Sequence, residues 1–450
     1  MKKFLYVVLI LFVLTGAALG AASWWIMQKM GPATWVELAE ENWNCRAEVG
    51  DAKLNLLTNP ATLKFINVRL APRDLEVAKA YAERTPLAEG SAVVVIPELT
   101  LSVKLDDLIN RRLFVEHVGI VSPSVTEIQD DEGKSTLEAL FKKPGSTEAV
   151  AATPKTEPLP PKVESQASEE PAPAFTYAVS SATIEKGQFN ITTGTTQVSI
   201  RDLDFKLTGI DVDKADLANH NRIQAVLNTT IDVTGMARID GAMRPAELAH
   251  LVVSGTGDIR PINPKTLEWK PFSQLSLTLA KGSVLGGFMT IGEAAGKELR
   301  KLQEYGVDLS PIIIGGPLMQ DAVVSGDFAN DLFITRSLTQ FVFPEYEVAI
   351  EPKSWVNAAK DRHEINLRLS TGPELQTRLS NGIAQAKLGE SIARALTKSL
   401  SDSQGRMTFD IESSGSLSDP KVKPKTERVL KNLMSGEGLG DLLQGLLKKL

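Results

Sequence analysis

Apolar and polar residues alternate with a period of two in the stretch between Gly90 and Phe141. This spacing is typical of a β-strand with one apolar face and one face in water. The apolar positions are Leu99, Leu101, Val103 and Leu105. Residues 63–70 form an earlier strand-like run, and residues 114–121 and 125–128 form two later ones. The pattern predicts a one-faced sheet element.

The same alternation returns in the second half of the chain. Its apolar positions are Ile223, Leu227, Ile231, Val233, Leu275, Leu277, Leu279, Ile365, Leu367, Leu369, Met407, Phe409 and Ile411. Residues 182–189 can also be laid over residues 118–125, with a chain-breaking Gly187 or Pro123 at the equivalent place. This similarity indicates a repeated sheet module. The chain is therefore predicted to be mainly β with helical inserts.

Helical spacing of apolar residues predicts helices over residues 32–43, 74–84, 293–305 and 373–400. Asp74 is expected to cap the second of them. A last, amphipathic helix is expected over residues 425–450, with an apolar stripe made of Leu439, Leu442, Leu443, Leu446, Leu447 and Leu450. Two roles remain open for this C-terminal helix, because it suits both an anionic membrane surface and a cap on the end of the sheet.

The N-terminus carries Lys2 and Lys3, followed by an uncharged apolar run over residues 4–27. The run is long enough to span a bilayer core of about 30 Å. The two lysines favour a cytoplasmic N-terminus, and Trp24 and Trp25 fit the aromatic belt at the far interface. A cleaved signal peptide is the alternative, because residues 16–22 are small. Both interpretations place the bulk of the chain on the non-cytoplasmic side.

Residues 142–174 consist largely of Pro, Glu, Ala, Ser, Thr and Lys. Such a segment buries too little apolar surface to offset the entropy cost of ordering it, so a disordered linker is expected. The predicted organisation is a membrane anchor with its flank, an N-terminal sheet region, this linker, a second sheet region with helical inserts, and the C-terminal helix. Their ranges are residues 1–30, 31–141, 142–174, 175–424 and 425–450.

The sequence contains no recognisable motif for catalysis or cofactor binding. Its four histidines are far apart and show no metal-ligand spacing; they are His117, His220, His250 and His363. A lone Cys45 allows no intrachain disulfide and is interpreted as an inert thiol. No enzyme activity, metal or cofactor is expected.

We interpret several short polar or glycine-containing stretches as turns or loops rather than as binding sites. Gly255 to Gly257 is expected to be a turn at the end of a strand, and residues 315–317 a loop. Asp211, Asp213 and residues 130–132 are interpreted as exposed turn acids. The formal net charge of −6 at pH 7 is mild and gives no support for nucleic-acid binding.

The order of these elements resembles that of the AsmA family of bacterial envelope proteins. The resemblance is carried by the anchor, the early strand LKFINVRL, the passages LDDLINRRLFVEHVGIVSPSVTE and DEGKSTLEAL, and the closing segment GSLSDPKVKP. It implies a single-pass inner-membrane protein with its bulk in the periplasm. It also implies a long curved antiparallel sheet whose open groove binds phospholipid, and a role in lipid transport and outer-membrane biogenesis. An outer-membrane or envelope protein partner is compatible with that role.

Alternation alone leaves two interpretations of the sheet. In a closed β-sandwich the apolar faces pack on one another, whereas in an open groove they line a binding surface. The sandwich fits a structural or scaffolding envelope protein without lipid cargo. In the groove, the floor is formed by Leu99, Leu101, Val103, Leu105, Ile223, Leu227, Ile231, Val233, Leu275, Leu277, Leu279, Ile365, Leu367 and Leu369.

Overall fold

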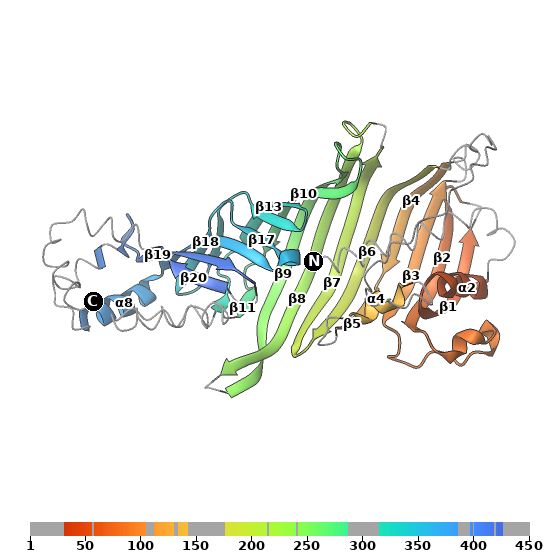
Figure 1. Cartoon of the computed structure of the whole chain (residues 1–450), viewed down its shortest axis with the longest axis horizontal. Coiled ribbons are helices and arrows are strands. Elements are labelled where there is room, and N and C mark those ends of the chain that lie inside the picture. The colour runs from red at the N-terminus through yellow and green to blue at the C-terminus, as the bar shows by residue number, and fades with distance from the viewer. Residues whose placement is uncertain are drawn as a thin grey trace, which may run out of the picture. The chain divides into compact units, whose positions relative to one another are not determined.

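The computed structural model of the chain is mainly β (Figure 1). It describes residues 31–55, 58–104, 112–129, 134–142, 176–213, 216–239, 242–286, 315–385, 397–398, 400–417 and 420–425. These residues form two compact units, one up to residue 194 and the other from residue 195 onward. None of the helices in these ranges has the length and apolar character that a membrane span requires.

The first unit is a mixed sheet with short helices beside it. Its strands are β1 (Cys45–Asn55), β2 (Ala61–Pro72), β3 (Val94–Lys104), β4 (Arg112–Val121), β5 (Ser124–Gln129) and β6 (Thr176–Thr193). Strands β1 to β4 pair in sequence order and are antiparallel. Strands β4 and β5 both pair with β6 in parallel, which corrects the expectation of a purely antiparallel sheet. The parallel pairing is feasible because residues 130–175 separate β5 from β6, and a parallel connection needs about a dozen residues or more.

Strand β6 continues the repeat that the sequence indicated. Val118 lies opposite Ala182 and Val125 lies opposite Phe189, so the partner's number is larger by 64 in both pairs. Ser122 and Lys186, which also differ by 64, both have left-handed backbone angles, with φ of 50° and 52°. The two segments therefore share a bulge as well as a register, and the bulge lies where Pro123 interrupts the first of them.

Two helices pack on the first sheet. Helix α2 (Pro32–Asn42) confirms the helix expected over residues 32–43, and Val36 on it is fully buried. Trp35 meets Phe65 of β2 edge to face, with ring centroids 4.9 Å apart. Helix α4 (Thr136–Leu140) is capped by the Ser135 hydroxyl, which accepts from the Glu138 N–H. These contacts close this part of the apolar face.

The single helix expected over residues 74–84 is wrong. The segment forms two 3₁₀ turns, η1 (Leu75–Ala78) and η2 (Tyr81–Glu83). Asp74 does act as a cap and accepts from the Glu76 N–H at 2.9 Å. Leu75 is 90% exposed, so the apolar spacing that predicted the helix meets no packing partner. Without burial of an apolar face, so short a helix is marginal.

The second unit begins with four long antiparallel strands. These are β7 (Thr196–Val212), β8 (Asn221–Ile239), β9 (Ala242–Ile262) and β10 (Trp269–Leu279), paired in that order. Strand β11 (Val284–Gly286) extends the edge of β9 and pairs with β12 (Gly315–Pro317). Residues 315–317 were expected to be a loop, and this pairing makes them a short strand instead.

Shorter antiparallel strands complete the second unit. They are β13 (Ala322–Ala329), β14 (Leu332–Thr335), β15 (Thr339–Val342), β16 (Tyr346–Ile350), β17 (Trp355–Asn357), β18 (Arg362–Thr371), β19 (Thr408–Gly415) and β20 (Pro420–Pro424). A 3₁₀ turn, η3 (Ala358–Lys360), precedes β18. Helix α8 (Pro373–Gln385) follows β18 and accounts for the described start of the helix expected over residues 373–400.

A packed core lies under α8. It contains Leu369 of β18, Met407, Val348 of β16, and Leu375, Leu379 and Ile383 of the helix, and the last three are no more than 1% exposed. Leu279 of β10 packs against this core from its edge. Helix α8 therefore covers the apolar face at the β16, β18 and β19 end of the second unit.

The expected anchor, linker and C-terminal helix lie outside the described residues, apart from a few at their margins. The helix expected over residues 293–305 and the turn at residues 130–132 also lie outside. These five remain predictions.

Candidate functional site

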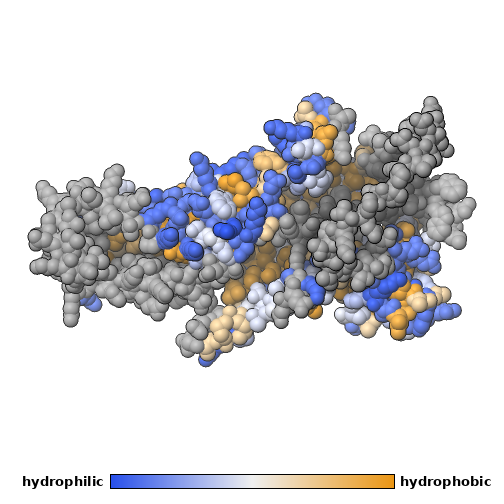
Figure 2. All heavy atoms as spheres, viewed as in Figure 1, coloured by the Kyte–Doolittle hydropathy of each residue, from blue (hydrophilic) through white to orange (hydrophobic). Residues whose placement is uncertain are grey.

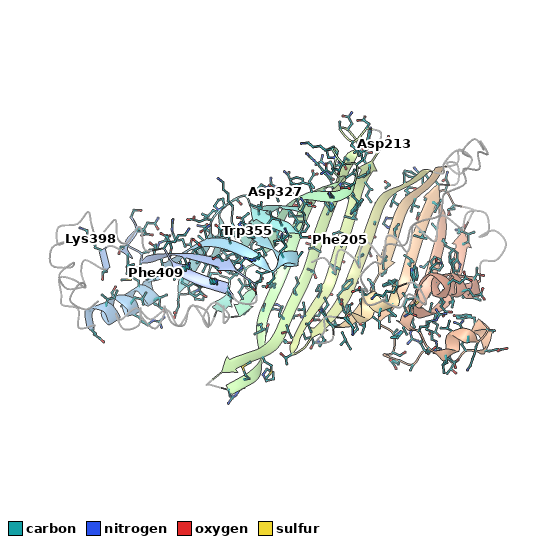
Figure 3. All side chains as sticks on the ribbon, viewed as in Figure 1. Phe205, Asp213, Asp327, Trp355, Lys398 and Phe409 are labelled. Atoms are coloured by element: carbon teal, nitrogen blue, oxygen red, sulfur yellow. The ribbon has the colours of Figure 1, made fainter. Side chains whose placement is uncertain are left out.

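The candidate site is one face of strands β7 to β10, and we call it the open apolar face. Phe205 of β7 is labelled in Figure 3. Leu227 of β8 lies opposite Phe205 and opposite Gly255 of β9. Ile231 lies opposite Ile200 and Leu251 in the same way. Because side chains alternate along a strand, the register places one set of residues on this face. The set is Val198, Ile200, Phe205, Leu207, Ile223, Ala225, Leu227, Thr229, Ile231, Val233, Ala249, Leu251, Val253, Gly255, Gly257, Ile259, Ser273, Leu275, Leu277 and Leu279.

The open apolar face carries no Asp, Glu, Lys, Arg or His residue, and most of its large side chains keep some contact with solvent. Ile223, Leu227, Ile231, Val233, Leu275 and Leu277 are all partly exposed. Figure 2 shows hydrophobic residues gathered over β8 and β9 on this side. A second layer packed on the face would bury such side chains almost fully, as it does Leu369 under α8.

Thr229 is the polar exception in the middle of β8. It is buried, and its hydroxyl donates to the Arg201 carbonyl oxygen at 2.9 Å. The partner is available because β7 bulges between Arg201 and Asp204. The hydroxyl is thus satisfied by the sheet itself, and the surface around it stays apolar.

Two glycines shape the floor of the face. Gly255 and Gly257 lie in the middle of β9, so the expected turn at the end of a strand is wrong. A Cβ atom on Gly255 would lie 2.5 Å from Leu277 Cδ2, and one on Gly257 would lie 3.0 Å from Leu275 Cδ2. The glycines are needed because the leucines of β10 lean across the neighbouring strand, which a local sequence pattern does not reveal.

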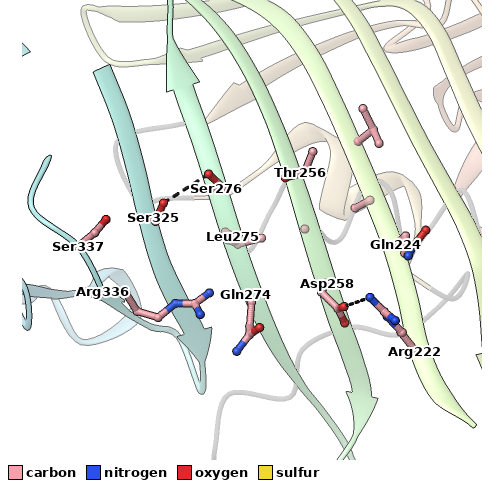
Figure 4. A pocket seen from close by; sticks show the side chains of 13 residues that line it. Arg222, Gln224, Thr256, Asp258, Gln274, Leu275, Ser276, Ser325, Arg336 and Ser337 are labelled. Carbon is pink, nitrogen blue, oxygen red and sulfur yellow. Dashed lines mark hydrogen bonds and ion pairs between the residues drawn. The ribbon is translucent and has the colours of Figure 1, made fainter. Parts of the chain in front are cut away.

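The opposite face of the same strands is polar and holds a pocket of about 580 Å³ (Figure 4). Its lining includes Gln224, Thr256, Asp258, Gln274, Ser276 and Ser325. Arg222 pairs with Asp258 at 2.5 Å, and the Ser276 and Ser325 hydroxyls lie 3.4 Å apart. Arg336, the other arginine of the lining, pairs with Asp327 at 3.1 Å, so both positive charges at this open pocket have carboxylate partners.

The other residues predicted to form the groove floor fall into three groups. Leu99, Val103 and Ile365 are partly exposed, like the open apolar face. Leu101 and Leu369 are buried at 2% and 1% exposure, and the partly buried Leu279 and Leu367 pack against the core under α8. Leu105, together with the predicted membrane-interface residues Lys2, Lys3, Trp24 and Trp25, lies outside the described residues. The structure therefore brings together the β8 and β10 rows and keeps Leu101 and Leu369 inside packed cores.

Two of the histidines singled out in the sequence lie against serine hydroxyls. His117 Nδ1 lies 2.9 Å from the Ser181 hydroxyl, and the buried His363 has Nε2 2.8 Å from the Ser413 hydroxyl but no partner for Nδ1 among the described residues. Burial raises the pKa of the Cys45 thiol to about 12, because a thiolate is poorly solvated there. That thiol is neutral at physiological pH, as expected for an inert cysteine.

His250 belongs to a group that sequence spacing did not reveal. Asp232, Glu247 and His250 lie close together on the polar face of β8 and β9. Their spacing in the sequence matches no metal-ligand motif, and only the pairing of β8 with β9 brings the aspartate to the histidine.

Comparisons of the chain with protein-family models, with curated proteins and with solved structures found no match.

Proposed function

We propose that this chain is a non-enzymatic envelope protein that binds phospholipid acyl chains on the open apolar face. The observation that carries the proposal is a four-strand apolar surface, free of charged residues, whose Leu227, Ile231 and Leu277 remain partly exposed. Soluble proteins seldom leave a contiguous apolar surface uncovered unless it binds something apolar. The resemblance to the AsmA family supports phospholipid as the ligand.

The mechanism is physical. Moving an acyl chain from a membrane into water costs about 0.8 kcal/mol for each CH₂ group. Leucine, isoleucine and valine side chains on the sheet remove most of that cost, while the headgroup stays in water beside the strands. Glycines at 255 and 257 keep the floor low beneath the leucines of β10.

The proposal extends to location and transport. Residues 4–27 would anchor the chain in the inner membrane and leave its bulk in the periplasm. A sheet held there would support lipid transport between the inner and outer membranes and so outer-membrane biogenesis. An outer-membrane or envelope protein would receive the lipid at the far end.

A scaffolding protein with a closed sheet is the second candidate. It is favoured by the two packed cores, one containing Leu101 and the other containing Leu369 under α8. In this alternative the partly exposed face of β8 contacts another protein rather than lipid.

Two substitutions on adjacent residues of β8 separate the candidates. Leu227→Asp places a charge on the open apolar face, whereas Val226→Asp places it on the polar face, where Val226 is 42% exposed. Mass spectrometry of lipids that co-purify with the protein should show a loss for Leu227→Asp and none for Val226→Asp, with both variants folded by circular dichroism. Absence of lipid from the wild-type protein, or equal lipid content in both variants, contradicts the proposal.

A further inference from the structure

Three side chains on the β8–β9 hairpin are arranged like the ligands of a metal ion. A ligand atom from each of Asp232, Glu247 and His250 lies within 4.8 Å of the others. All three belong to the polar face, on the other side of the sheet from the open apolar face. A ligand bound by these three side chains would therefore not compete with lipid on the open apolar face.

A β-bulge creates this arrangement. Asp232 lies opposite His250, but the register then shifts, so that Val233 pairs with Ala249 and Thr234 pairs with Glu247. In a regular strand, residues three apart point to opposite faces. The extra residue, Leu248, restores Glu247 to the face of His250.

The carboxylate of Asp232 is already oriented. Arg201 holds its Oδ2 atom, with Nε at 2.8 Å and Nη2 at 2.6 Å, and leaves Oδ1 directed at His250 Nδ1, 2.6 Å away. Two partners therefore hold this carboxylate in place, with Oδ2 on Arg201 and Oδ1 on the side of His250.

The third member is free to bind. Glu247 is exposed and forms no ion pair within the described part of the chain. Counting Arg201 as positive and His250 as neutral, the four side chains carry a net charge of −1, which a divalent cation would reverse. The arrangement thus combines one oriented carboxylate, one unpaired carboxylate and one imidazole.

We propose that Asp232, Glu247 and His250 bind a divalent transition-metal ion such as Zn²⁺. One imidazole nitrogen with two carboxylates is a ligand set that Zn²⁺ accepts, whereas Ca²⁺ and Mg²⁺ prefer oxygen ligands alone. The ion takes the place of the hydrogen between His250 Nδ1 and Asp232 Oδ1, and that proton moves to Nε2, so that the ligating imidazole stays neutral. Arg201 stays on Oδ2 and orients the ligating carboxylate, as partners of metal ligands commonly do.

The bound ion would tie β8 to β9 at the base of a projecting arm. Beyond Thr234, β8 pairs with β9 alone among the described residues, because the paired part of β7 ends at Gln197 opposite Thr234. A two-stranded hairpin is marginally stable by itself. A cross-strand metal ion at Asp232 and His250 would therefore stiffen the arm where its support from β7 ends.

Calorimetric titration of the untagged full-length protein with Zn²⁺ tests the proposal. His250→Ala and Glu247→Gln should each weaken Zn²⁺ binding at least about 10-fold, a loss comparable to the effect of altering metal-site residues. His220→Ala is the matched control, since His220 also contacts a carboxylate, Asp211 at 2.9 Å, but belongs to no three-ligand group in the described residues. It should bind Zn²⁺ like the wild type.

Co²⁺ provides a second readout that does not depend on stability. The wild-type protein should give a visible absorption band with Co²⁺, and His250→Ala should lose that band while its circular dichroism is unchanged. No Zn²⁺ binding by the wild type, or equal affinity in the wild type and His250→Ala, overturns the site. Loss of binding in His220→Ala alone overturns it as well.

Discussion

The hydroxyl of Tyr81 binds both backbone groups of Val49. It donates to the Val49 carbonyl oxygen at 2.9 Å and accepts from the Val49 N–H at 3.3 Å. Strand β1 pairs only with β2 in the described residues, so Val49 lies on a free sheet edge. Two residues earlier on the same edge, the Ala47 N–H donates to Glu40 Oε1 at 2.9 Å. Side chains from the flanking segments thus satisfy an edge that would otherwise be open to another strand.

Tyr81→Phe should therefore destabilise the first unit by about 1 kcal/mol and increase self-association. Urea denaturation followed by tryptophan fluorescence measures the first effect, and sedimentation velocity measures the second. Tyr346→Phe is the control, because the Tyr346 hydroxyl is buried and has no hydrogen-bond partner in the part of the chain that the structure describes. Removing that hydroxyl should cost nothing. Equal behaviour of the two variants would show that Tyr81 does not protect the edge.

Glu40→Gln should destabilise the same unit by about 3 kcal/mol, because it leaves the guanidinium of Arg84 buried without its counter-charge. Glu40 and Arg84 lie 2.7 Å apart, with side chains only 5% and 8% exposed. The comparison is Asp51→Asn, which removes the exposed pair with Lys53 and should change the free energy of unfolding by less than about 1 kcal/mol. Similar losses in both variants would contradict a special role for the buried pair.

Gly255→Ala should destabilise the second unit by about 1–3 kcal/mol, since its new methyl group overlaps Leu277 and the leucine must move away. Thermal unfolding monitored by circular dichroism provides the measurement. Gly31→Ala is the matched change at an open position, where a Cβ atom meets nothing within 4 Å. If Gly255→Ala unfolds at the wild-type temperature, the floor of β9 tolerates a side chain.

The pKa of His220 should lie above its ordinary value. A hydrogen bond with Asp211, together with the charge of that carboxylate, raises the pKa of His220. A raised pKa in the folded protein stabilises it at pH values below the unfolded pKa of about 6.5, and this contribution is lost as pH rises through the folded pKa. NMR titration of the His220 ring protons gives the pKa, and Asp211→Asn should return it toward its ordinary value. An unchanged pKa in Asp211→Asn would show that the contact is absent in solution.

Strands were predictable from sequence where one face is apolar and the other polar. The alternation at Ile223, Leu227 and Ile231 gave strand β8 and its apolar face directly, because the side-chain period of a strand is two. Strand β3 followed in the same way from Leu99 and Leu101. These features depend on local pattern alone.

The predictions that failed concern residues whose structural partners are distant in sequence. Gly255 and Gly257 suggested a turn, but they are glycines because the side chains of Leu275 and Leu277 occupy the space above them. The group of possible metal ligands was not predicted, because His250 and Glu247 are three residues apart. In a regular strand this spacing places the two side chains on opposite faces, and only the bulge in β9 brings them to the same face. The parallel pairing of β4 with β6 also has no local signature.

The constant register between β6 and strands β4 and β5 allows the sheet to be widened by adding copies of one module. Strand β6 pairs in parallel with β4 and β5, and each of its paired residues lies opposite the residue 64 positions earlier. The bulge at Lys186 lies beside the bulge at Ser122. The outer edge of β6 therefore repeats the hydrogen-bonding groups of the segment it covers. Each copy of the module thus widens the sheet through the same backbone contacts, so a change in copy number changes the width of the sheet and requires no new kind of interface.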